Sequence, residues 1–326
     1  MSDRRDDGRR VNVLFVMGSG RDGSTILANA IGENAGFASF GELAYFWERG
    51  VLGGWPCGCG RPLESCGFWQ GVTKRLGPES IVPVARRMTA FLTRNLRVLP
   101  MLTLRLPRRL RAAAKRADDE LEEVMFHIGR LYAAIGESSG AQFIVDSSKN
   151  PVYAALLRSI PGIDVWTIHL IRDSRAVAFS WSTSKRDRSG VRESMPRRGP
   201  LRSAVGWLTY HAIAETLWRG RRSHYLRLTY DEFVRDPYDA ISRIIELVSG
   251  DGSRSPESLD GNIVDLHVHH TVSGNPTRFL TGEVVLRSDE RWRRDMPRTQ
   301  RWVTTLLTWP GLWRYRLGFA RRGDRR

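Results

Sequence analysis

Cysteine, a secretion signal and long apolar runs are scarce or absent in this sequence, and each absence excludes a class of protein. Three cysteines in 326 residues are too few, and odd in number, for a disulfide framework, so we expect a reducing compartment. No stretch matches the run of about 18 apolar residues that a membrane-spanning helix needs. The opening MSDRRDDGRR lacks the apolar centre of a signal peptide, which predicts a disordered tail over residues 1–10 and a cytoplasmic protein.

Acidic residues are also in short supply, because 35 Asp and Glu stand against 51 Lys and Arg, a net charge of +16. This balance favours anionic partners such as phosphates, nucleic acid, acidic substrates or a membrane surface. Residues 80–117 hold ten basic and no acidic side chains, with Met88 and Leu92 at helical spacing. We expect one domain over residues 11–326 with an inserted helical cap at about 55–117, either a solvated lid or a peripheral membrane contact.

The stretch VNVLFVMGSGRDGSTILANAIGE, residues 11–33, indicates a strand, a glycine-rich turn and a helix. Its first residues are β-branched, aromatic and apolar, as in a buried parallel strand. The glycines let the backbone bend and approach a ligand closely. A helix that begins at Ser24 turns its free N–H groups back toward the turn, and Arg21 adds a positive charge. The stretch therefore predicts an anion site.

Two familiar motifs overlap on this turn, and neither fits fully. Gly18-x-Gly20-x-x-Gly23 is the dinucleotide fingerprint, and Glu42 falls 19 residues later, about where an acid meets the ribose of NAD. The Walker A spacing is present too, but Ser24 stands where a kinase needs lysine. The turn alone thus leaves open an NAD(P)-dependent oxidoreductase, another nucleotide enzyme or an ordinary turn. A basic nucleic-acid-binding protein is a further alternative, but no reader motif accompanies the basic cluster.

Further charged groups follow the other predicted strands. Glu42 follows a strand at residues 37–40, Lys149 follows one that begins at Phe143, and Arg172 ends one at residues 165–171. Ser180 lies two helical turns after Arg172. Because the carboxyl ends of parallel strands meet at one edge, we expect an α/β fold in which these groups share a crevice. An arginine fork and a serine hydroxyl can together bind one phosphate.

Cysteines and histidines form two clusters that resemble metal sites. The cysteine spacing C-x-C-x6-C has no fourth ligand nearby and does not match the usual zinc patterns, so a glycine-rich loop is the preferred interpretation. The histidines alternate along a predicted strand and are interpreted as structural. We expect no metal. The residues concerned are Cys57, Cys59, Cys66, His267, His269 and His270.

Taken together, two motifs resemble those of sulfotransferases that use 3′-phosphoadenosine 5′-phosphosulfate (PAPS). GSGRDGST is similar to the 5′-phosphosulfate loop, and IRDSRAVAFS to the 3′-phosphate motif, an arginine followed eight positions later by serine. The resemblance implies a P-loop-like central parallel sheet flanked by helices. It implies a PAPS site formed by Gly20, Arg21, Asp22, Gly23, Ser24 and Thr25 at the 5′ end and by Arg172 and Ser180 at the 3′-phosphate.

The branch with tyrosylprotein sulfotransferases and bacterial relatives is the most similar. Its Gly-Glu base matches Glu42, and its lysine before a helix-opening proline matches Lys149. LRLTYDEF resembles the segment that places Tyr230 near the nucleotide, and TVSGNPTRF a late loop that makes Ser273 and Arg278 cofactor contacts. The histidine base of the phenol and hydroxysteroid branch has no counterpart.

The resemblance implies in-line transfer of a sulfuryl group to a hydroxyl, with Glu42 as general base. Arg21 and Lys149 would neutralise the transferring and leaving groups. The acceptor would be a small molecule, a glycolipid or a carbohydrate, and nucleic acid is not expected. Near the end of the chain, Trp302, Leu306 and Trp309 share one helical face. We expect that face to pack on the sheet, with an interfacial membrane helix as the alternative.

Overall fold

The computed structural model describes most of the chain: residues 10–77, 80–95, 118–183, 197–218, 220, 222–252 and 254–317. The predicted tail, except its last residue, and the last third of the predicted cap, residues 96–117, lie outside these ranges. Within them, no helix has the length and apolar character that crossing a bilayer requires.

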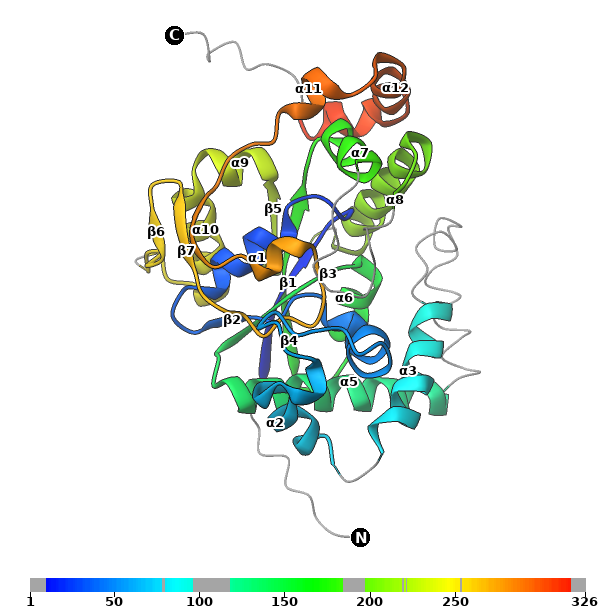
Figure 1. Ribbon diagram of the computed structural model, residues 1–326, viewed down its shortest axis with the longest axis vertical. Coiled ribbons are helices and arrows are strands. Elements are labelled where there is room, and N and C mark those ends of the chain that lie inside the picture. Colours follow the sequence, from blue (N-terminus) through cyan, green and yellow to red (C-terminus); the bar gives the residue numbers. More distant parts are fainter. Residues whose placement is uncertain are drawn as a thin grey trace.

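A five-stranded parallel sheet forms the centre of the molecule (Figure 1). Its order is β2-β3-β1-β4-β5, with bounds β1 Val11–Met17, β2 Phe37–Ser39, β3 Phe143–Lys149, β4 Ile163–Ile171 and β5 Tyr225–Thr229. Strands β2 and β3 lie on one side of β1 in the strand order, and β4 and β5 lie on the other, so the order reverses direction at β1. Ligands bind open α/β sheets at such a reversal, beyond the carboxyl ends of the strands.

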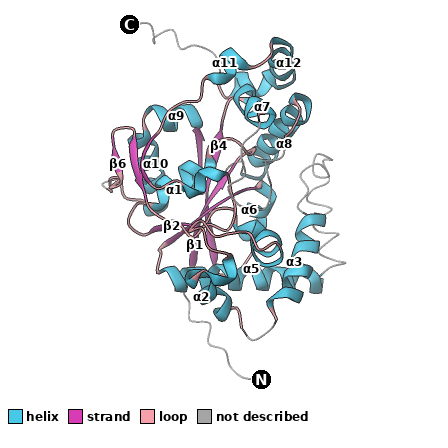
Figure 2. Ribbon diagram, in the orientation of Figure 1, coloured by secondary structure: helices cyan, strands magenta, loops and turns pink. Residues whose placement is uncertain are grey.

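Helices cover both faces of the sheet, and a small antiparallel sheet lies at its side (Figure 2). The predicted α/β class with a central parallel sheet flanked by helices is therefore confirmed. The small sheet contains β6 Leu259–Asp260, β7 Ile263–Leu266 and β8 Gly282–Val285. The helices are α1 Ser24–Gly32, α2 Gly67–Arg75, α3 Ile81–Asn95, α5 Asp118–Ser139, α6 Pro151–Leu157, α7 Ser174–Ser182, α8 Pro200–Trp218, α9 Tyr230–Arg235, α10 Pro237–Ser249, α11 Arg291–Asp295 and α12 Arg298–Arg314.

Local sequence signals set several helix starts next to the site. The Asn150 side chain accepts the backbone N–H of Val152 and so caps α6, which opens with Pro151 as predicted. Asp173 likewise caps α7, directly after β4. These caps fix where each helix leaves the sheet, and hence where the strand-end residues lie.

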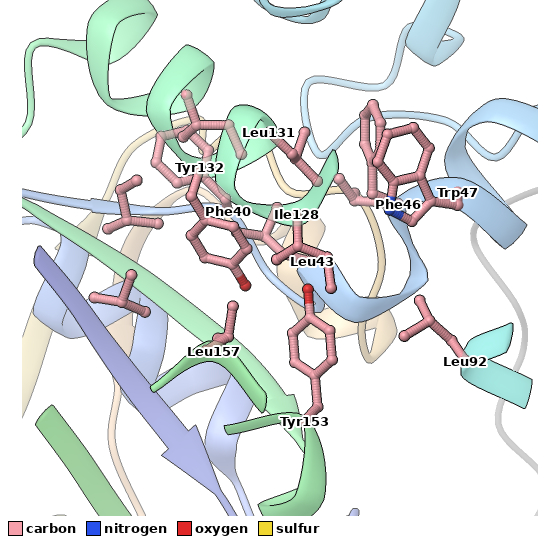
Figure 3. Packing of buried hydrophobic residues seen from close by; sticks show 14 of the residues in the cluster. Phe40, Leu43, Phe46, Trp47, Leu92, Ile128, Leu131, Tyr132, Tyr153 and Leu157 are labelled. Carbon is pink, nitrogen blue, oxygen red and sulfur yellow. The ribbon is translucent and has the colours of Figure 1, made fainter. Parts of the chain in front are cut away.

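Alternate side chains of β1 enter two hydrophobic cores, one on each face of the sheet. Phe15 belongs to the core under α5 and α6, and Leu14 to the core under α1 and α10. Figure 3 shows the first core, where Leu131 and Tyr132 of α5 lie beside Phe40. Each fully buried large apolar side chain stabilises such a core by about 1.5–3 kcal/mol.

The first core also takes in the described part of the predicted cap. Trp69 of α2 and Met88 of α3 are fully or almost fully buried there. A π-helical segment at Phe46–Leu52 (η2) packs between α3 and the site. These helices therefore rest on the same core as the sheet. The cap boundaries stay a prediction.

The apolar face of α12 is exposed, so the expectation that it packs on the sheet is wrong. Trp302 and Leu306 are each 74% exposed, and Trp309 is 56% exposed. The helix instead packs on α7 and α8 through its other face, where Thr304, Thr308 and Leu312 are buried. The Thr308 hydroxyl lies 2.7 Å from that of Ser174, which satisfies both buried groups. The helical period identified an apolar face but not which face meets the protein.

Candidate functional site

The turn after β1 adopts a strained conformation that presents its donors to a ligand. Gly23 begins α1 with φ +95°, and Arg21 has φ +61° although it carries a side chain. Lys149, at the end of β3, has φ +69°. Among the residues described, Arg316 is the third non-glycine residue with positive φ. Such backbone costs about 1–3 kcal/mol per residue and concentrates at functional sites.

One cavity of about 340 Å³ lies at the carboxyl edge of the sheet. Its size falls in the range of small-molecule sites, about 300–1,000 Å³. It brings together eleven residues that the sequence predicted for the site: Gly20, Arg21, Asp22, Gly23, Ser24, Thr25, Glu42, Lys149, Arg172, Ser180 and Tyr230. The loop, the strand-end charges and the helix serine therefore share one crevice, as their positions predicted.

Two predicted residues do not line the cavity. Ser273 is fully buried behind Glu42 and donates to Glu42 Oε2 at 3.3 Å. Arg278 donates to the carbonyls of Thr271 at 2.8 Å and Pro56 at 2.7 Å. Arg278 thus ties two loops together, and its predicted contact with a cofactor stays a prediction. Ser273 orients the carboxylate of Glu42.

The carboxylate of Glu42 lies at the centre of a charged network. Lys149 Nζ donates to Oε1 at 2.5 Å, and Arg49 Nη1 donates to Oε2 at 3.1 Å. Burial alone would raise the pKa of Glu42, but the positive charges of Lys149 and Arg49 outweigh it and hold that pKa below its usual value. Glu42 is therefore ionised at neutral pH and able to accept a proton.

Unpaired donors line the turn at the start of α1. Arg21 Nη1 and the hydroxyls of Ser19 and Ser24 are buried and have no hydrogen-bond partner among the residues described. Leaving a buried donor without a partner costs about 1–3 kcal/mol, more when it is charged. Burial also lowers the pKa of Arg21. An oxyanion in the cavity would satisfy these donors, so the turn fits a phosphate- or sulfate-like group.

Asp22 has a different part in this turn. Its Oδ1 accepts the backbone N–H of Ser24 at 3.1 Å, and its side chain fills the space beside Gly18. A Cβ on Gly18 would stand 1.9 Å from Asp22 Oδ2. Asp22 therefore fixes the shape of the turn from within, and one N–H of the helix start is already taken.

Arg172, directly after β4, and Ser180, on α7, both line the cavity, and each is less than 10% exposed. The Arg172 guanidinium stacks 4.6 Å from the Tyr230 ring centroid and donates to the Arg21 carbonyl at 3.2 Å. Its backbone carbonyl accepts the indole N–H of Trp207 at 2.9 Å. The arginine is held in place and still lines the cavity, which suits a second anionic group.

Several lining residues were missed by sequence reasoning. Arg49 is the main one, since it binds Glu42 and stacks 3.7 Å from Tyr45 and 5.0 Å from Trp55. It lies on the π-helical segment η2, which does not follow the 3.6-residue period of an α-helix. The spacing of apolar residues therefore could not predict that Arg49 faces the site. Arg198 and Tyr210, which also line the cavity, carry no motif.

The histidine and cysteine clusters meet in a way the sequence did not predict. His267 and His269 each contact a carboxylate oxygen of Glu33, at 2.8 Å. His270 Nδ1 instead lies 3.5 Å from Cys57 Sγ and 3.3 Å from Cys66 Sγ. The sequence has no fourth ligand near the cysteines, and in the folded chain His270 reaches them from a distant segment.

Gly23→Ala is expected to destabilise the protein by about 2–5 kcal/mol, since it adds a left-handed strain and an overlap. A Cβ at Gly23 would lie 2.4 Å from the Tyr230 ring. Gly140→Ala is the matched control, with φ +66° and nothing within 4 Å of the added atom. It should lose only about 1–2 kcal/mol. Urea denaturation measures both, and equal losses would refute the close approach of Tyr230.

Asp146 predicts a pH dependence of stability. This fully buried carboxylate accepts the N–H groups of Ser148 and Leu43 and the hydroxyl of Tyr132, and burial raises its pKa to about 6. Between about pH 4 and pH 6 the carboxyl of Asp146 therefore keeps its proton in the folded protein but has lost it in the unfolded chain, where its pKa is about 3.9. Because the folded state binds more protons in this range, the free energy of unfolding falls as pH rises from about 4 through 6.

In Asp146→Asn this fall should disappear. Relative to the wild type, the variant should gain about 3 kcal/mol of unfolding free energy between about pH 4 and pH 7. Urea denaturation across that range tests it, and parallel curves for the two proteins would contradict the raised pKa of Asp146.

Comparisons with known proteins add a structural likeness only. No protein-family model matches the chain, and no curated protein matches its sequence. A sulfotransferase domain from the curacin biosynthetic pathway is similar in structure, with a TM-score of 0.47 and 13% identity over 93% of this chain and 98% of that domain. A sulfotransferase domain from the Synechococcus PCC 7002 olefin synthase gives a TM-score of 0.40 and 18% identity over 95% and 98%. At such scores neither neighbour assigns a role to any residue.

Proposed function

We propose that this chain is a sulfotransferase that moves a sulfuryl group from PAPS to a hydroxyl. One observation carries the proposal: a single cavity joins the donor-rich turn, the Arg172–Ser180 pair and the buried Glu42–Lys149 ion pair. A ligand with two separate anionic ends would satisfy both basic regions, and PAPS has such ends. When bound, it supplies an activated sulfuryl group next to a phosphate leaving group.

Two groups of residues, one at each end of the cavity, would bind the two anionic ends of PAPS. Arg21, Ser24 and the start of α1 would hold the 5′-phosphosulfate, since their donors lie unpaired along the turn. Arg172 and Ser180 would hold the 3′-phosphate through charge-assisted hydrogen bonds. Tyr230 stacks on Arg172 and stands over Gly23, so it links the two ends.

Glu42 and Lys149 would do the chemical work. Glu42 is ionised and would take the proton of the acceptor hydroxyl. Lys149 would stabilise negative charge on the departing phosphate, and Arg21 that on the sulfuryl oxygens. In the structure Lys149 is paired with Glu42, so an anion that draws Lys149 away would free a lone pair of the carboxylate. Arg49 and Ser273 would then keep Glu42 in place.

The acceptor we propose is a hydroxyl-bearing small molecule, glycolipid or carbohydrate. Tyr45, Trp55 and Tyr210 line the cavity together with Glu42, and aromatic faces suit a ring or a sugar. Arg49 stacks on two of these rings and so joins the base to the acceptor side. Contact of the exposed α12 face with a membrane stays a prediction.

The two alternatives from the sequence fit the site less well. In an NAD enzyme Glu42 would bind a ribose hydroxyl, but here Lys149 and Arg49 already occupy both of its oxygens. A nucleic-acid-binding protein would need a continuous basic surface. Five basic side chains instead line one cavity together with acidic groups: Arg21, Arg49, Lys149, Arg172 and Arg198.

Incubation of the purified protein with radiolabelled PAPS and a panel of phenols, sugars, glycolipids and cell extract tests the activity. We expect label to appear in at least one hydroxyl acceptor and 3′-phosphoadenosine 5′-phosphate to be released. Failure to label any acceptor, with the nucleotide also failing to bind, would remove the proposed function.

A further inference from the structure

Three cysteines and one histidine converge outside the cavity, and the proposed reaction uses none of them. The four side chains are Cys57, Cys59, Cys66 and His270, and their ligand atoms all lie within 4.8 Å of one another. Cys57 and Cys66 are almost completely buried, and no disulfide joins any of the three cysteines. A buried group of three thiols and an imidazole has the composition of a structural zinc site.

The distances match the edges of a tetrahedron around one zinc ion. With Zn–S near 2.3 Å and Zn–N near 2.0–2.1 Å, two sulfurs would lie about 3.8 Å apart and sulfur and nitrogen about 3.5 Å apart. Cys59 Sγ lies 3.7 Å from Cys66 Sγ. His270 Nδ1 lies 3.5 Å from Cys57 Sγ and 3.3 Å from Cys66 Sγ. These three distances are therefore already those of a zinc tetrahedron, and no two of the four ligand atoms lie more than 4.8 Å apart.

The fold supports this arrangement from both sides. A bridge between Pro56 and Pro62 closes the cysteine loop, and Gly58 N–H donates to the Thr271 carbonyl at 2.9 Å. A Cβ at Gly58 would lie 2.2 Å from the carbonyl oxygen of His269, so the two segments touch backbone to backbone. The His270 ring stacks on Phe68, with centroids 5.0 Å apart and planes at 10°. The imidazole is thus held in one orientation.

We propose that Cys57, Cys59, Cys66 and His270 bind one structural Zn²⁺ ion. Binding forms three Zn–S bonds and one Zn–N bond, and the three thiol protons pass to solvent. All four positions are filled by protein, which distinguishes a structural site from a catalytic one that keeps a position open. The tetrahedral set of three sulfurs and one nitrogen favours zinc over magnesium or calcium, which prefer oxygen ligands.

The ion would join two segments that shape the cavity. Trp55, two residues before Cys57, lines the cavity, and Ser273, three residues after His270, holds Glu42. Arg278 reinforces the same junction through Pro56 and Thr271. Zinc would therefore position the loop beside the base without touching the reacting groups. This inference does not depend on the sulfotransferase proposal.

Metal analysis of the full chain tests the site directly. The protein is produced without a histidine tag in zinc-supplemented medium, and its metal content is measured by plasma mass spectrometry. We expect about one zinc per chain, released when a mercurial blocks the thiols of the native protein. A zinc content near zero, or a disulfide between Cys59 and Cys66 in the freshly purified protein, would overturn the proposal.

Variants identify the ligands. Cys66→Ser and His270→Ala should lose the metal, whereas His270→Cys should keep it because zinc also accepts four cysteines. His267→Ala is the matched control, since this exposed histidine contacts Glu33 and not the thiols. In Co²⁺-loaded wild type and His270→Cys we expect the thiolate charge-transfer bands of tetrahedral cobalt. Equal metal loss in His267→Ala, or full retention in both Cys66→Ser and His270→Ala, would refute the assignment.

Discussion

Glu42→Gln is expected to lower sulfuryl-transfer turnover by about 10²–10⁴-fold, the usual contribution of a general base. The amide keeps the shape of the side chain but cannot take the acceptor proton. Nucleotide binding should survive and even tighten, because Lys149 and Arg49 lose the negative charge that they now share. Turnover assays combined with titration of 3′-phosphoadenosine 5′-phosphate separate the two effects.

Glu48→Gln serves as the control for this substitution. Glu48 lies on the same segment as Arg49 but is exposed and does not line the cavity. The Glu48→Gln variant should transfer the sulfuryl group at the wild-type rate. Unchanged turnover in Glu42→Gln would remove Glu42 from the mechanism, whereas loss of nucleotide binding in the same variant would make it a structural residue.

Arg172→Ala should weaken binding of 3′-phosphoadenosine 5′-phosphate by about 10–100-fold, as removal of a charge-assisted hydrogen bond does. Binding of adenosine 5′-phosphate, which has no 3′-phosphate, should hardly change. Arg172 also donates to the carbonyl of Arg21, so its removal can shift the turn after β1. Such a shift would affect both ligands, and the comparison between them therefore corrects for it. Isothermal titration of both ligands measures the difference.

Arg175→Ala is the matched control for Arg172→Ala. Arg175 lies in the first turn of α7, three residues after Arg172, pairs with Asp173 at 2.6 Å and does not line the cavity. It removes the same charge from the same region, so general electrostatic attraction would weaken equally in both variants. If Arg175→Ala loses as much preference for the 3′-phosphate as Arg172→Ala, the assignment of that subsite is wrong.

Much of the site was predictable because its signals are local. A strand, a glycine turn and a helix start are encoded within residues 11–33, and the caps Asn150 and Asp173 mark two further strand-to-helix turns. In a parallel sheet the carboxyl ends of all strands lie at the same edge, so residues that follow these strands come close together whatever the rest of the sequence. Glu42, Lys149 and Arg172 are therefore gathered by topology alone.

What the sequence did not reveal depends on contacts between distant segments. Cys66 and His270 are separated by 204 positions, and no spacing rule links them. Arg278 lies in a segment that resembles a cofactor loop, yet its guanidinium binds two carbonyls of neighbouring loops. The apolar face of α12 was visible in the helical period, but this face is exposed because the opposite one, with Thr304, Thr308 and Leu312, packs on α7 and α8.

Binding of nucleotides to the wild-type protein tests the central claim, that the cavity binds PAPS, most directly. It measures which nucleotide the cavity binds most tightly. The protein is titrated separately with 3′-phosphoadenosine 5′-phosphate, adenosine 5′-phosphate, ATP and NAD, and both affinity and thermal stabilisation are measured. The account predicts the tightest binding and the largest stabilisation with 3′-phosphoadenosine 5′-phosphate, which engages both basic regions. Stronger stabilisation by NAD or ATP, or no preference for the 3′-phosphate, would contradict it.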